Sequence, residues 1–525
     1  MTAATAVREP ARGQPGRGAP SRPEPVTLDG STTHWVGPLL VLIVGMFMTV
    51  LDTSIVNVAI PTIQTQFGGS TSEVAWISTS YALVLGVVVP TTAWLGDRFG
   101  LGRVYTISLI GFALGSALCG LAWSLPSLIA FRVVQAIPGG ILPVITMTMV
   151  YRIVPKDRIG SAMGLYGIGV VAAPALGPTL GGYLVQFVDW RLIFYINVPI
   201  AVLGVALAVW MLPRFVQQPT YRFDYLGFVT VAGGLVALLL AFSEGGSWGW
   251  TSYPTLALII GGALSLAAFV VIELEVEHPL LNLAVLRNWA YVNSLLIISV
   301  QTIGLFATLF YIPVFLQSAL GMPALEAGLV VLPQALVMAV MAPLSGRLYD
   351  RIGPRWLVFS GLMIASFATH LMTGLTLNTT KGQIITWTCL RSIGVGLAMM
   401  SVTASGLSAL EPRLTTSGTA INNVIQRVSS ALGLAALSAM VTAQQAQFVA
   451  DRNGLLTSAT PGTGKLGLTG LYLVAREANL EVLATALTNM FQVTTWITVV
   501  AALLALSLRS GPDRPASGVG AAALD

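Results

Sequence analysis

The sequence predicts an all-α polytopic membrane protein with about fourteen spans, and three observations lead to this prediction. First, 55% of the 525 residues are hydrophobic and 9% are charged, with a mean hydropathy of +0.81. A soluble domain carries about 25% charged residues, so this composition could not cover a soluble surface. Second, the apolar residues gather in fourteen segments of membrane-spanning length, about 20 residues each. Third, two stretches of sequence, one in each half of the chain, resemble each other.

The fourteen segments fall into three groups along the chain. We predict an N-terminal six-helix bundle over 35–213, two inserted linker helices over 214–285 and a C-terminal six-helix bundle over 286–508. The inserted pair is separated by the short turn SEGGSWGW. The predicted spans are 37–62, 73–95, 104–123, 126–150, 160–187, 190–212, 224–243, 253–273, 290–317, 325–345, 355–376, 383–409, 418–443 and 486–508.

Basic residues concentrate in every second connection, which predicts the orientation because positive charge stays on the cytoplasmic side. Both termini should therefore be cytoplasmic, in a cell (inner) membrane. We expect 1–34 and 509–525 to be disordered cytoplasmic tails, and about 444–485 to be an extracytoplasmic loop, folded as a small cap or mobile. The basic set is Arg98, Arg103, Arg152, Lys156, Arg158, Arg214, Arg222, Arg287, Arg347, Arg351, Arg355 and Arg413, against Arg191, Lys381, Arg452, Lys465 and Arg476 on the other side.

Two pairs of similar positions indicate an internal repeat. WLGDRFGLGR follows the second span and SGRLYDRIGPR follows the tenth, so Asp97 and Asp350 lie 253 residues apart (350 minus 97). Arg132 in the fourth span and Arg391 in the twelfth lie 259 apart (391 minus 132). Parallel halves of this kind are typical of a large class of transporters.

Asp52 is the most informative intramembrane charge. A charge at the bilayer centre costs about 3 kcal/mol, so few should be present without a use. Burial disfavours an ionised carboxyl group, and a group that gains and loses a proton near neutral pH suits proton coupling. Asp52 could instead cap the backbone or pair permanently with an arginine. The Asn57 amide, five residues on, could face the same cavity.

Arg132 and Gln135 share one face of the fourth span because they are three residues apart. An arginine does not deprotonate, so Arg132 could tune a nearby carboxylate or organise a water chain. A purely structural role is equally compatible with the sequence. For Arg391 and Arg427 the structural interpretation is stronger, and Arg391 could snorkel to the outer surface. His370 we expect to be a packing residue.

The segment AAPALGPTLGG interrupts the fifth span with Pro174 and Pro178. A proline leaves a carbonyl unpaired, which neighbours must satisfy, and small residues let helices approach closely. We therefore predict a kinked, closely packed helix at a hinge or a sealed interface. Its glycines are Gly177, Gly181 and Gly182.

These motifs resemble those of the fourteen-helix drug:proton antiporters of the major facilitator superfamily, the EmrB/QacA type, from about residue 37 to residue 508. The first-helix signature is the most specific match. The matching segments are LDTSIVNVAIP (51–61), LGDRFG (95–100), FRVVQ (131–135), ALGPTLGG (175–182), DWRLIFYINVPI (189–200) and YIPVFLQSALGMPALEAGLVVLP (311–333).

Some positions depart from the family pattern. Ala93, Ala136 and Ala173 stand where glycines are usual, and Leu101 and Gly102 stand where basic residues are usual. The three alanines replace one small residue with another, whereas Leu101 and Gly102 remove charges from the loop. We expect these departures to affect the details of gating and to leave the class of protein unchanged.

The resemblance implies a major facilitator fold and roles for several residues. Asp52 would be the site of protonation or substrate binding, and Arg132 would take part in proton coupling. The loop aspartate and arginine, Asp97 and Arg98, would form a cytoplasmic charge latch, and Asp97 could lie at a helix N-terminus, where it favours the helix dipole. The gating residues we expect are Asp97, Arg98, Gly100, Asp350 and Arg351, together with Pro174, Gly177, Pro178, Gly181 and Gly182.

From these features we expect proton-coupled efflux of small hydrophobic molecules by alternating access, with cationic ones compatible with Asp52. The driving force would be the proton-motive force, without a cofactor or metal, since the chain has no Gly-x-x-x-x-Gly-Lys-Ser/Thr phosphate loop. The partners would be protons, lipids and substrate, with no nucleic acid, and the protein would be a monomer. The substrate cavity would hold Asn57, Tyr81, Gln135, Phe306, Phe310 and Tyr311.

Three other functions remain compatible with the sequence. One is dedicated export of one metabolite, antibiotic, lipid or siderophore. Another is a non-transporting sensor that kept the fold. The third, a membrane enzyme, is disfavoured because the intramembrane Asp52 and the three histidines do not make a convergent catalytic set. Cys119 and Cys389 have no metal-ligand spacing, and we expect them to be inert thiols.

Overall fold

The computed structural model describes residues 35–213, 215, 222–458 and 468–508. All regular secondary structure in these residues is helical, and fourteen helical spans are long and apolar enough to cross a membrane. The predicted fold class and number of spans are therefore confirmed. The predicted tails, 1–34 and 509–525, lie outside the described residues, as do Arg214 and Lys465.

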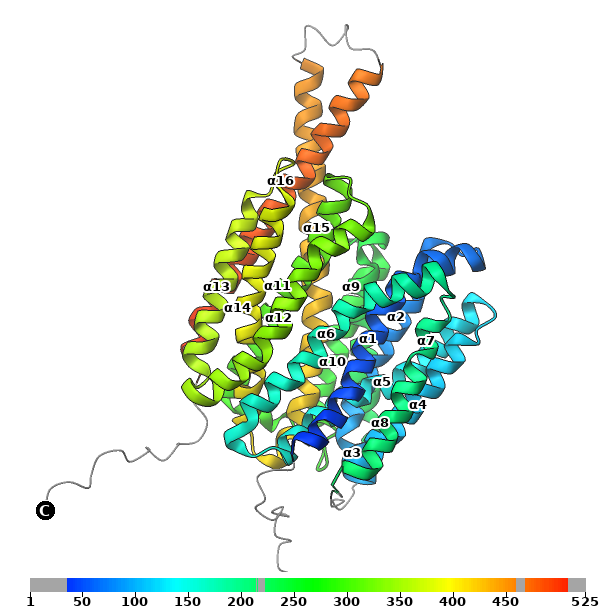
Figure 1. Cartoon of the computed structure of the whole chain (residues 1–525), viewed down its shortest axis with the longest axis vertical. Helices are drawn as coiled ribbons and strands as arrows, with labels where there is room; N and C mark the ends of the chain where they lie inside the picture. Colours follow the sequence, from blue (N-terminus) through cyan, green and yellow to red (C-terminus); the bar gives the residue numbers. More distant parts are fainter. Residues whose placement is uncertain (1–34, 214, 216–221, 459–467, 509–525) are drawn as a thin grey trace, which may run out of the picture. The chain divides into compact units, whose positions relative to one another are not determined.

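The helices follow one another with short connections (Figure 1). The first six spans are α1 (Val36–Phe67), α2 (Thr71–Val88) continued by η1 (Val89–Thr91) and α3 (Thr92–Phe99), α4 (Leu101–Gly120), α5 (Leu125–Ile153), η2 (Lys156–Arg158) with α6 (Ile159–Phe187), and α7 (Leu192–Tyr195) with α8 (Asn197–Met211). The inserted pair is α9 (Tyr225–Trp248) and α10 (Tyr253–Glu275). The last six are, after η3 (Leu283–Arg287), α11 (Trp289–Val314) with η4 (Phe315–Ala319), α12 (Ala324–Ile352), α13 (Pro354–Leu371) with η5 (Met372–Gly374), α14 (Lys381–Ser408), η6 (Pro412–Leu414) with α15 (Thr415–Ser458), and α16 (Leu468–Ala505).

Most of the segment predicted as a loop, 444–485, is helical in the described residues, so the two flanking helices are longer than predicted. Helix α15 continues to Ser458 and α16 begins at Leu468, and Figure 1 shows both running past the ends of the neighbouring helices. The stretch 444–458 contains no proline and a single glycine, so nothing stops a helix that the membrane span has already nucleated. The intervening residues 459–467 lie outside the described part.

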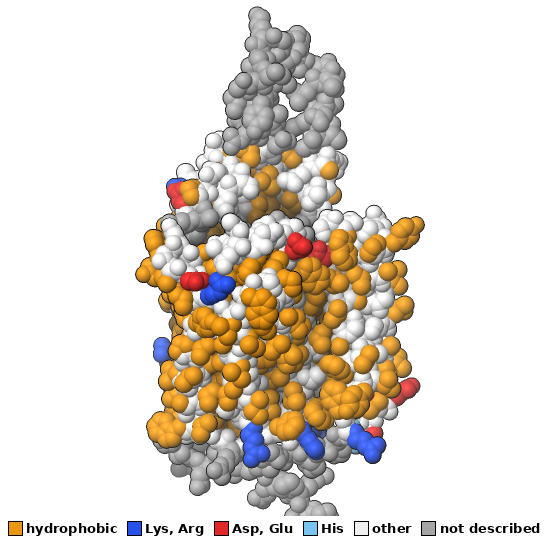
Figure 2. Space-filling model, turned by 90° about the vertical axis from the view of Figure 1, so that its right-hand side faces the viewer, with side chains coloured by type: hydrophobic (Ala, Val, Ile, Leu, Met, Phe, Trp, Pro, Cys, Tyr) orange, Lys and Arg blue, Asp and Glu red, His pale blue; other side chains and the backbone are white. Residues whose placement is uncertain are grey.

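Lys and Arg side chains mark one side of the described structure, which we call the arginine-rich side. It carries the connections that hold Arg98, Arg152, Arg347, Arg355 and Arg413. Figure 2 shows a broad hydrophobic band on one face, with Lys and Arg along its lower margin. This is the distribution expected where lipid tails meet head groups.

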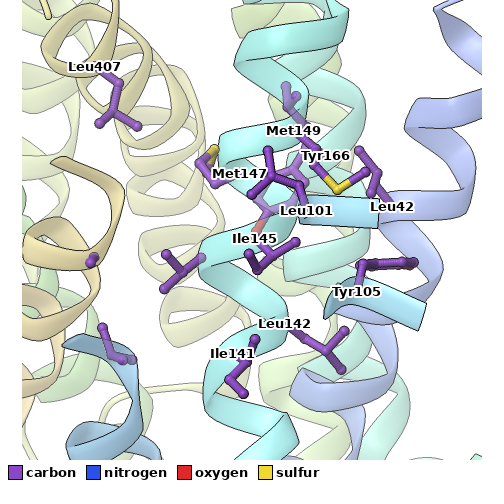
Figure 3. Close-up of a cluster of buried hydrophobic side chains, with 14 of the residues drawn as sticks. Leu42, Leu101, Tyr105, Ile141, Leu142, Ile145, Met147, Met149, Tyr166 and Leu407 are labelled. Atoms are coloured by element: carbon purple, nitrogen blue, oxygen red, sulfur yellow. The ribbon is translucent and has the colours of Figure 1, made fainter. Parts of the chain in front are cut away.

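The two halves share one hydrophobic core on the arginine-rich side. This core contains Ile153, Ile159 and Tyr166 from the first half, with Met400 and Leu407 from the second. Figure 3 shows part of it, with Leu407 on α14 and nine labelled side chains of the first half. Burial of these side chains holds the halves together there.

On the opposite side the halves have separate cores. One core is built only from the first half and includes Ile63, Val74 and Trp190. The other is built only from the second half and includes Phe315 and Ile384. The described residues are thus closed on the arginine-rich side, whereas the two halves do not share a core on the opposite side.

The closed side is sealed by a glycine contact between α6 and α12. A Cβ added to Gly164 would lie 2.8 Å from both the Cα of Pro343 and the carbonyl oxygen of Ala342. Gly160 and Gly346 meet backbone to backbone in the same seam. Larger residues at these positions would force the two halves apart.

Helix α9 packs against both halves. It contacts α2 of the first half and α15 of the second, in addition to its partner α10. In the most apolar stretch of 18 consecutive residues in each helix, 28% of the residues are buried in α9 and 17% in α10, so α10 is the more peripheral helix. The inserted pair thus lies alongside the gap between α2 and α15.

Candidate functional site

Asp52 lies on α1 and is fully buried, with 0% of its surface exposed. Its Oδ2 atom accepts a hydrogen bond from Arg132 Nη1 at 2.5 Å. Its Oδ1 atom accepts from Gln135 Nε2 at 2.8 Å and from Asn197 Nδ2 at 2.9 Å. A carboxylate with three such donors is stabilised in its charged form despite burial.

Arg132 completes this cluster from α5. Besides Asp52, its Nη1 atom donates to Gln135 Oε1 at 2.8 Å, and its Nε atom donates to the Ile77 carbonyl at 3.4 Å. The guanidinium lies over the Tyr81 ring, 3.8 Å from the ring centroid. One face of the cation is thus covered by an aromatic ring, a cation–π contact that is strongest when water is excluded.

The network continues away from the ion pair through Asn197 and Ser116. Asn197 Nδ2 also donates to Ser116 Oγ at 3.0 Å, and Ser116 Oγ donates to the Phe194 carbonyl at 2.8 Å. Asn197 Oδ1 is buried without a hydrogen-bond partner in the described structure. The cluster therefore joins α1, α4, α5 and α8 and retains one unused acceptor.

The cluster contains one cation and one carboxyl group that depend on each other. Arginine keeps its charge in proteins, so the net charge of the cluster depends on Asp52. Loss of the Asp52 charge would leave a buried cation without its counter-ion, which costs several kcal/mol unless the helices move.

A cavity of about 440 Å³ lies between the two halves next to α9. Its walls come from α2, α9, α11 and α15. Ser78, Thr79, Ser243, Ser430 and Ser438 contribute hydroxyl groups. The remaining lining residues are Ala82, Leu83, Leu239, Phe242, Gly246, Trp250, Phe310, Arg427, Ala431, Leu434 and Ala435.

The structure divides the predicted cavity residues. Phe310 lines the cavity, and Asn57 lies beside it, accepting a hydrogen bond from Ser78 Oγ at 2.9 Å. Tyr81 and Gln135 belong instead to the Asp52 cluster, where Tyr81 is 2% exposed and Gln135 0%. Because Asp52 is also buried, its carboxylate does not line the cavity wall, and the sequence argument for cationic substrates loses its basis.

For Phe306 and Tyr311 the cavity prediction is wrong. Tyr311 is buried in the core of the second half, since it follows Phe310 by one residue and points about 100° away around the helix. Phe306 is partly exposed, at 37%, and is not among the residues that line the cavity.

The polar contact between the two halves on the arginine-rich side is made by Asp350, whereas the resemblance placed the latch on Asp97 and Arg98. Its Oδ1 atom accepts from Gly160 N at 2.8 Å, and its Oδ2 atom accepts from Ser161 N at 2.8 Å and from Ser161 Oγ at 2.6 Å. Gly160 and Ser161 form the first turn of α6, so a carboxylate of the second half caps a helix of the first. Tyr151 Oη adds a bond to the Ala404 carbonyl at 3.3 Å.

Asp97, expected at a helix N-terminus, lies elsewhere. It is half-buried in the last turn of α3 and interacts with Arg152. The prediction that Asp97 caps a helix is therefore wrong. The residue that caps a helix N-terminus is Asp350, which occupies the equivalent position in the second half of the repeat. Gly100 and Gly353, which end the two similar turns, share positive φ angles of 85° and 78° that favour glycine. Arg98 and Arg351 are exposed on the same side.

The fifth span is not interrupted at its prolines, because α6 is continuous from Ile159 to Phe187. Pro178 has no N–H to give the carbonyl four residues earlier, and that carbonyl, of Pro174, accepts from Ser54 Oγ at 3.2 Å. A neighbouring helix thus replaces the missing donor. The Pro178 side chain lies outside the described side chains.

The glycines of this segment differ in their surroundings. A Cβ on Gly177 would collide with Ser54, and one on Gly181 would lie 2.9 Å from Ile55 Cγ1, so both allow α6 to approach α1. Gly182 has nothing within 4 Å of such a Cβ. The predicted close packing holds for Gly177 and Gly181 and is wrong for Gly182, which lies on another face.

Arg391 does not snorkel. It is 5% exposed, and its Nε atom donates to Thr369 Oγ1 at 3.3 Å. A Cβ on Gly304 would lie 3.2 Å from Arg391 Nη2. Gly304 therefore occupies a position beside Arg391 similar to that of Asp52 beside Arg132. Because it is a glycine, it supplies no carboxylate to Arg391. His370 is exposed at the end of α13.

Sequence reasoning missed Asn197, Ser116 and the contribution of α9. Asn197 lies in DWRLIFYINVPI, where an amide within an apolar run was the available signal. Phe242 of α9 and Trp250 of the turn after it line the cavity, although α9 belongs to the pair predicted as linkers. Arg427 also lines it, and the sequence favoured a structural role there.

Comparison with known proteins agrees with this geometry. The sequence profile described as Major Facilitator Superfamily matches residues 42–434. The MFS-type transporter YhcA of Bacillus subtilis (strain 168) is 35% identical over 404 residues, covering 77% of this chain and 76% of that protein. The Multidrug resistance protein B homolog of Mycobacterium tuberculosis (strain ATCC 25618 / H37Rv) is 30% identical over 445 residues, covering 84% and 82%.

Among solved structures, the proton:xylose symporter XylE, a protein of the same superfamily, superposes with a TM-score of 0.58. It is 14% identical and the match covers 90% of this chain and 94% of that one. At this identity the likeness concerns the fold alone.

Two halves, fourteen spans and a buried intramembrane ion pair define a membrane transporter rather than an enzyme. The chain belongs to the major facilitator superfamily. Within it, the predicted membership of the fourteen-helix drug:proton antiporter family is confirmed by relatives that carry multidrug resistance names.

Proposed function

We propose that this protein exports small hydrophobic molecules in exchange for protons by alternating access. Asp52 binds and releases the proton, and Arg132 ties its charge state to the positions of the helices. The arginine-rich side faces the cytoplasm of a cell membrane, so that both termini are cytoplasmic. The protein works as a monomer, without a cofactor or adaptor, on the proton-motive force.

The observation that carries this proposal is the buried ion pair between Asp52 and Arg132, with its N–O distance of 2.5 Å and side chains 0% and 2% exposed. A buried pair of this kind is a weak source of stability compared with apolar packing. Its use is better explained by a charge that is switched on and off during a cycle.

The separate cores support the alternating-access part of the proposal. If the arginine-rich side faces the cytoplasm, the described conformation is closed toward the cytoplasm, where the two halves share a core. The cavity lies between the two halves, which have separate cores on the opposite side. In this state Asp52 is sealed from the cavity, so a proton reaches it only after the cluster rearranges. Rocking of one half against the other supplies that rearrangement.

The energy is sufficient for export. A proton moving inward gains about 2.3 kcal/mol per 100 mV of membrane potential. Each unit of pH difference adds about 1.4 kcal/mol. One proton per cycle can therefore support a substrate gradient of more than tenfold. The relative named as a multidrug resistance protein supports drugs as one class of substrate.

The test is export of the uncharged dye Nile red from energised cells by the wild type, Asp52→Asn and the exposed control Asp157→Asn. We expect the wild type and the control to export dye until a protonophore is added, since both keep the buried pair. Asp52→Asn should lose uphill export but retain energy-independent exchange of dye across proteoliposomes, because its cavity is unchanged. Protonophore-sensitive export by Asp52→Asn at the wild-type rate would show that the proton binds elsewhere.

A further inference from the structure

Arg427 is a cation in the cavity without a counter-ion. It lies on α15, is half-buried and is one of the residues that line the cavity. Its Nε atom is buried without a hydrogen-bond partner, and none of the carboxylates in the described residues forms an ion pair with it. This contrasts with Arg132, whose charge Asp52 neutralises at 2.5 Å.

The rest of the cavity wall contains no charge that could balance Arg427. The other lining residues are hydroxyl-bearing, aromatic, aliphatic or glycine. Asp52 is 0% exposed and already engaged with Arg132. A half-buried guanidinium without a counter-ion is costly, and a bound anion would relieve that cost.

We infer that the cavity binds a small amphiphilic anion, with its carboxylate, phosphate or sulfonate group on Arg427. This names the substrate class of the exporter proposed above and rests on that proposal. The planar guanidinium suits such groups because it offers two parallel donors to two oxygens.

The cavity wall also carries hydroxyl groups near Arg427. Thr79 on α2 and Ser438 on α15 are among the lining residues. Ser430 and Ser78 line the cavity too, but the Ser430 hydroxyl donates to the Arg427 carbonyl and the Ser78 hydroxyl donates to Asn57 Oδ1, so an anion would reach them only by displacing those bonds. The lining residues include no carboxylate that would attract a cation.

The apolar end of the ligand has its own surface. The lining residues on the side of the inserted helices are apolar: Leu239 and Phe242 of α9, Trp250 of the turn after α9, and Phe310 of α11. A volume of about 440 Å³ is within the range of sites that enclose drug-sized molecules. The charge on Arg427 repels a cation that would otherwise stack on these rings.

The experiment uses three probes with one pyrene body and different charge: pyrenebutanoate, pyrenebutanol and pyrenebutylamine. Binding to the full chain in lipid nanodiscs is followed by fluorescence anisotropy, with empty nanodiscs subtracted. We expect the wild type to bind the anion most tightly and the amine most weakly. Arg427→Gln should weaken anion binding about tenfold or more and leave the alcohol within about threefold, as expected for loss of a charge-assisted bond.

The control variant is Arg413→Gln, which removes an exposed arginine that pairs with Glu411 just before α15. It should leave all three affinities unchanged, and Arg427→Lys should retain part of the preference for the anion. Equal or tighter binding of the amine by the wild type overturns the inference, even if Arg427→Gln does not fold. So does an unchanged anion affinity in a folded Arg427→Gln protein.

Two further results separate this inference from the proposed function. If the protein exports Nile red in a proton-driven way but does not prefer pyrenebutanoate, the proposed export function is supported and the inferred anion site is refuted. Binding of pyrenebutanoate that depends on Arg427, without proton-driven transport, would support the anion site and refute proton-coupled export. A pyrene-labelled phosphatidic acid tests a lipid source, and the small anion is refuted if that lipid binds and pyrenebutanoate does not.

Discussion

The Asp52 cluster concentrates two opposite charges and two amides among buried side chains. Each member depends on the others, because Gln135 contacts both Asp52 and Arg132 and Asn197 holds the second carboxylate oxygen. Removing one charge leaves its partner uncompensated, whereas removing both leaves a set of neutral polar groups that still bond to each other.

We therefore expect Arg132→Gln to reduce the free energy of unfolding by about 3 kcal/mol, since it leaves the buried Asp52 without its counter-ion. Adding Asp52→Asn to that variant should recover much of the loss. Thermal unfolding of the purified protein in detergent, arranged as a double-mutant cycle, measures the coupling. Arg413→Gln is the matched control, because its pair with Glu411 is exposed and worth at most about 1 kcal/mol. Additive effects of the two buried substitutions would contradict this account.

The second half of the repeat has the arginine without the acid. Arg391 bonds to Thr369, and Gly304 stands next to its guanidinium. The halves are therefore alike in the position of the cation and different in the group that titrates beside it. Proton exchange of the kind proposed for Asp52 has no counterpart in this half.

Helix α6 shows how a span tolerates two prolines. The carbonyl that loses its donor at Pro178 is served by Ser54 from α1, and Gly177 and Gly181 let the two helices approach closely enough for that bond. The helix remains continuous because the bond is replaced from outside the helix.

Ser54→Ala should therefore lower the free energy of unfolding by about 1–3 kcal/mol, because the Pro174 carbonyl would be buried without a donor. Pro178→Ala restores a backbone N–H to α6 and should make the same Ser54→Ala change nearly neutral. The measurement is the thermal midpoint of the four proteins of this cycle. A loss of the same size in both backgrounds would mean that Ser54 acts through packing alone.

The sequence was sufficient for the spans and for the identity of the charged residues, and insufficient for their contacts. Apolar length and composition predict a membrane helix directly, so fourteen spans could be counted. Asp52 and Arg132 were both recognised, but their contact joins residues 80 apart on different helices, and helical periodicity relates only near neighbours. Asn197 and the α9 aromatic side chains were missed for the same reason, since their partners lie on other helices.

The relation between the two halves depends on few polar contacts at the closed side. Asp350 caps α6, Tyr151 bonds to Ala404, and the shared core lies behind them. The repeat predicted two halves but could not predict which turn supplies the latch. Asp97 and Asp350 lie in the same sequence motif. Only the packing of the helices determines that Asp350, rather than Asp97, contacts a helix N-terminus.

Asp350→Asn should shift the protein toward opening on the arginine-rich side. Loss of a charged cap is worth about 1 kcal/mol, which changes the ratio of closed to open molecules about fivefold. The distance between the halves can be measured by double electron–electron resonance. The spin labels are attached at Arg103→Cys and Arg413→Cys, in a protein with Cys119 and Cys389 replaced by serine. Glu326→Gln is the control on the opposite side, and equal distance distributions in all three proteins would exclude Asp350 as a latch.

The unpaired charge of Arg427 also has an electrical consequence. A cycle that carries a monoanion outward and one proton inward moves two unit charges across the bilayer in the same sense. The interior-negative potential then contributes about 4.6 kcal/mol per 100 mV to each cycle, twice the contribution for a neutral cargo. The transporter would generate a current, and voltage would drive it even where the two sides have the same pH.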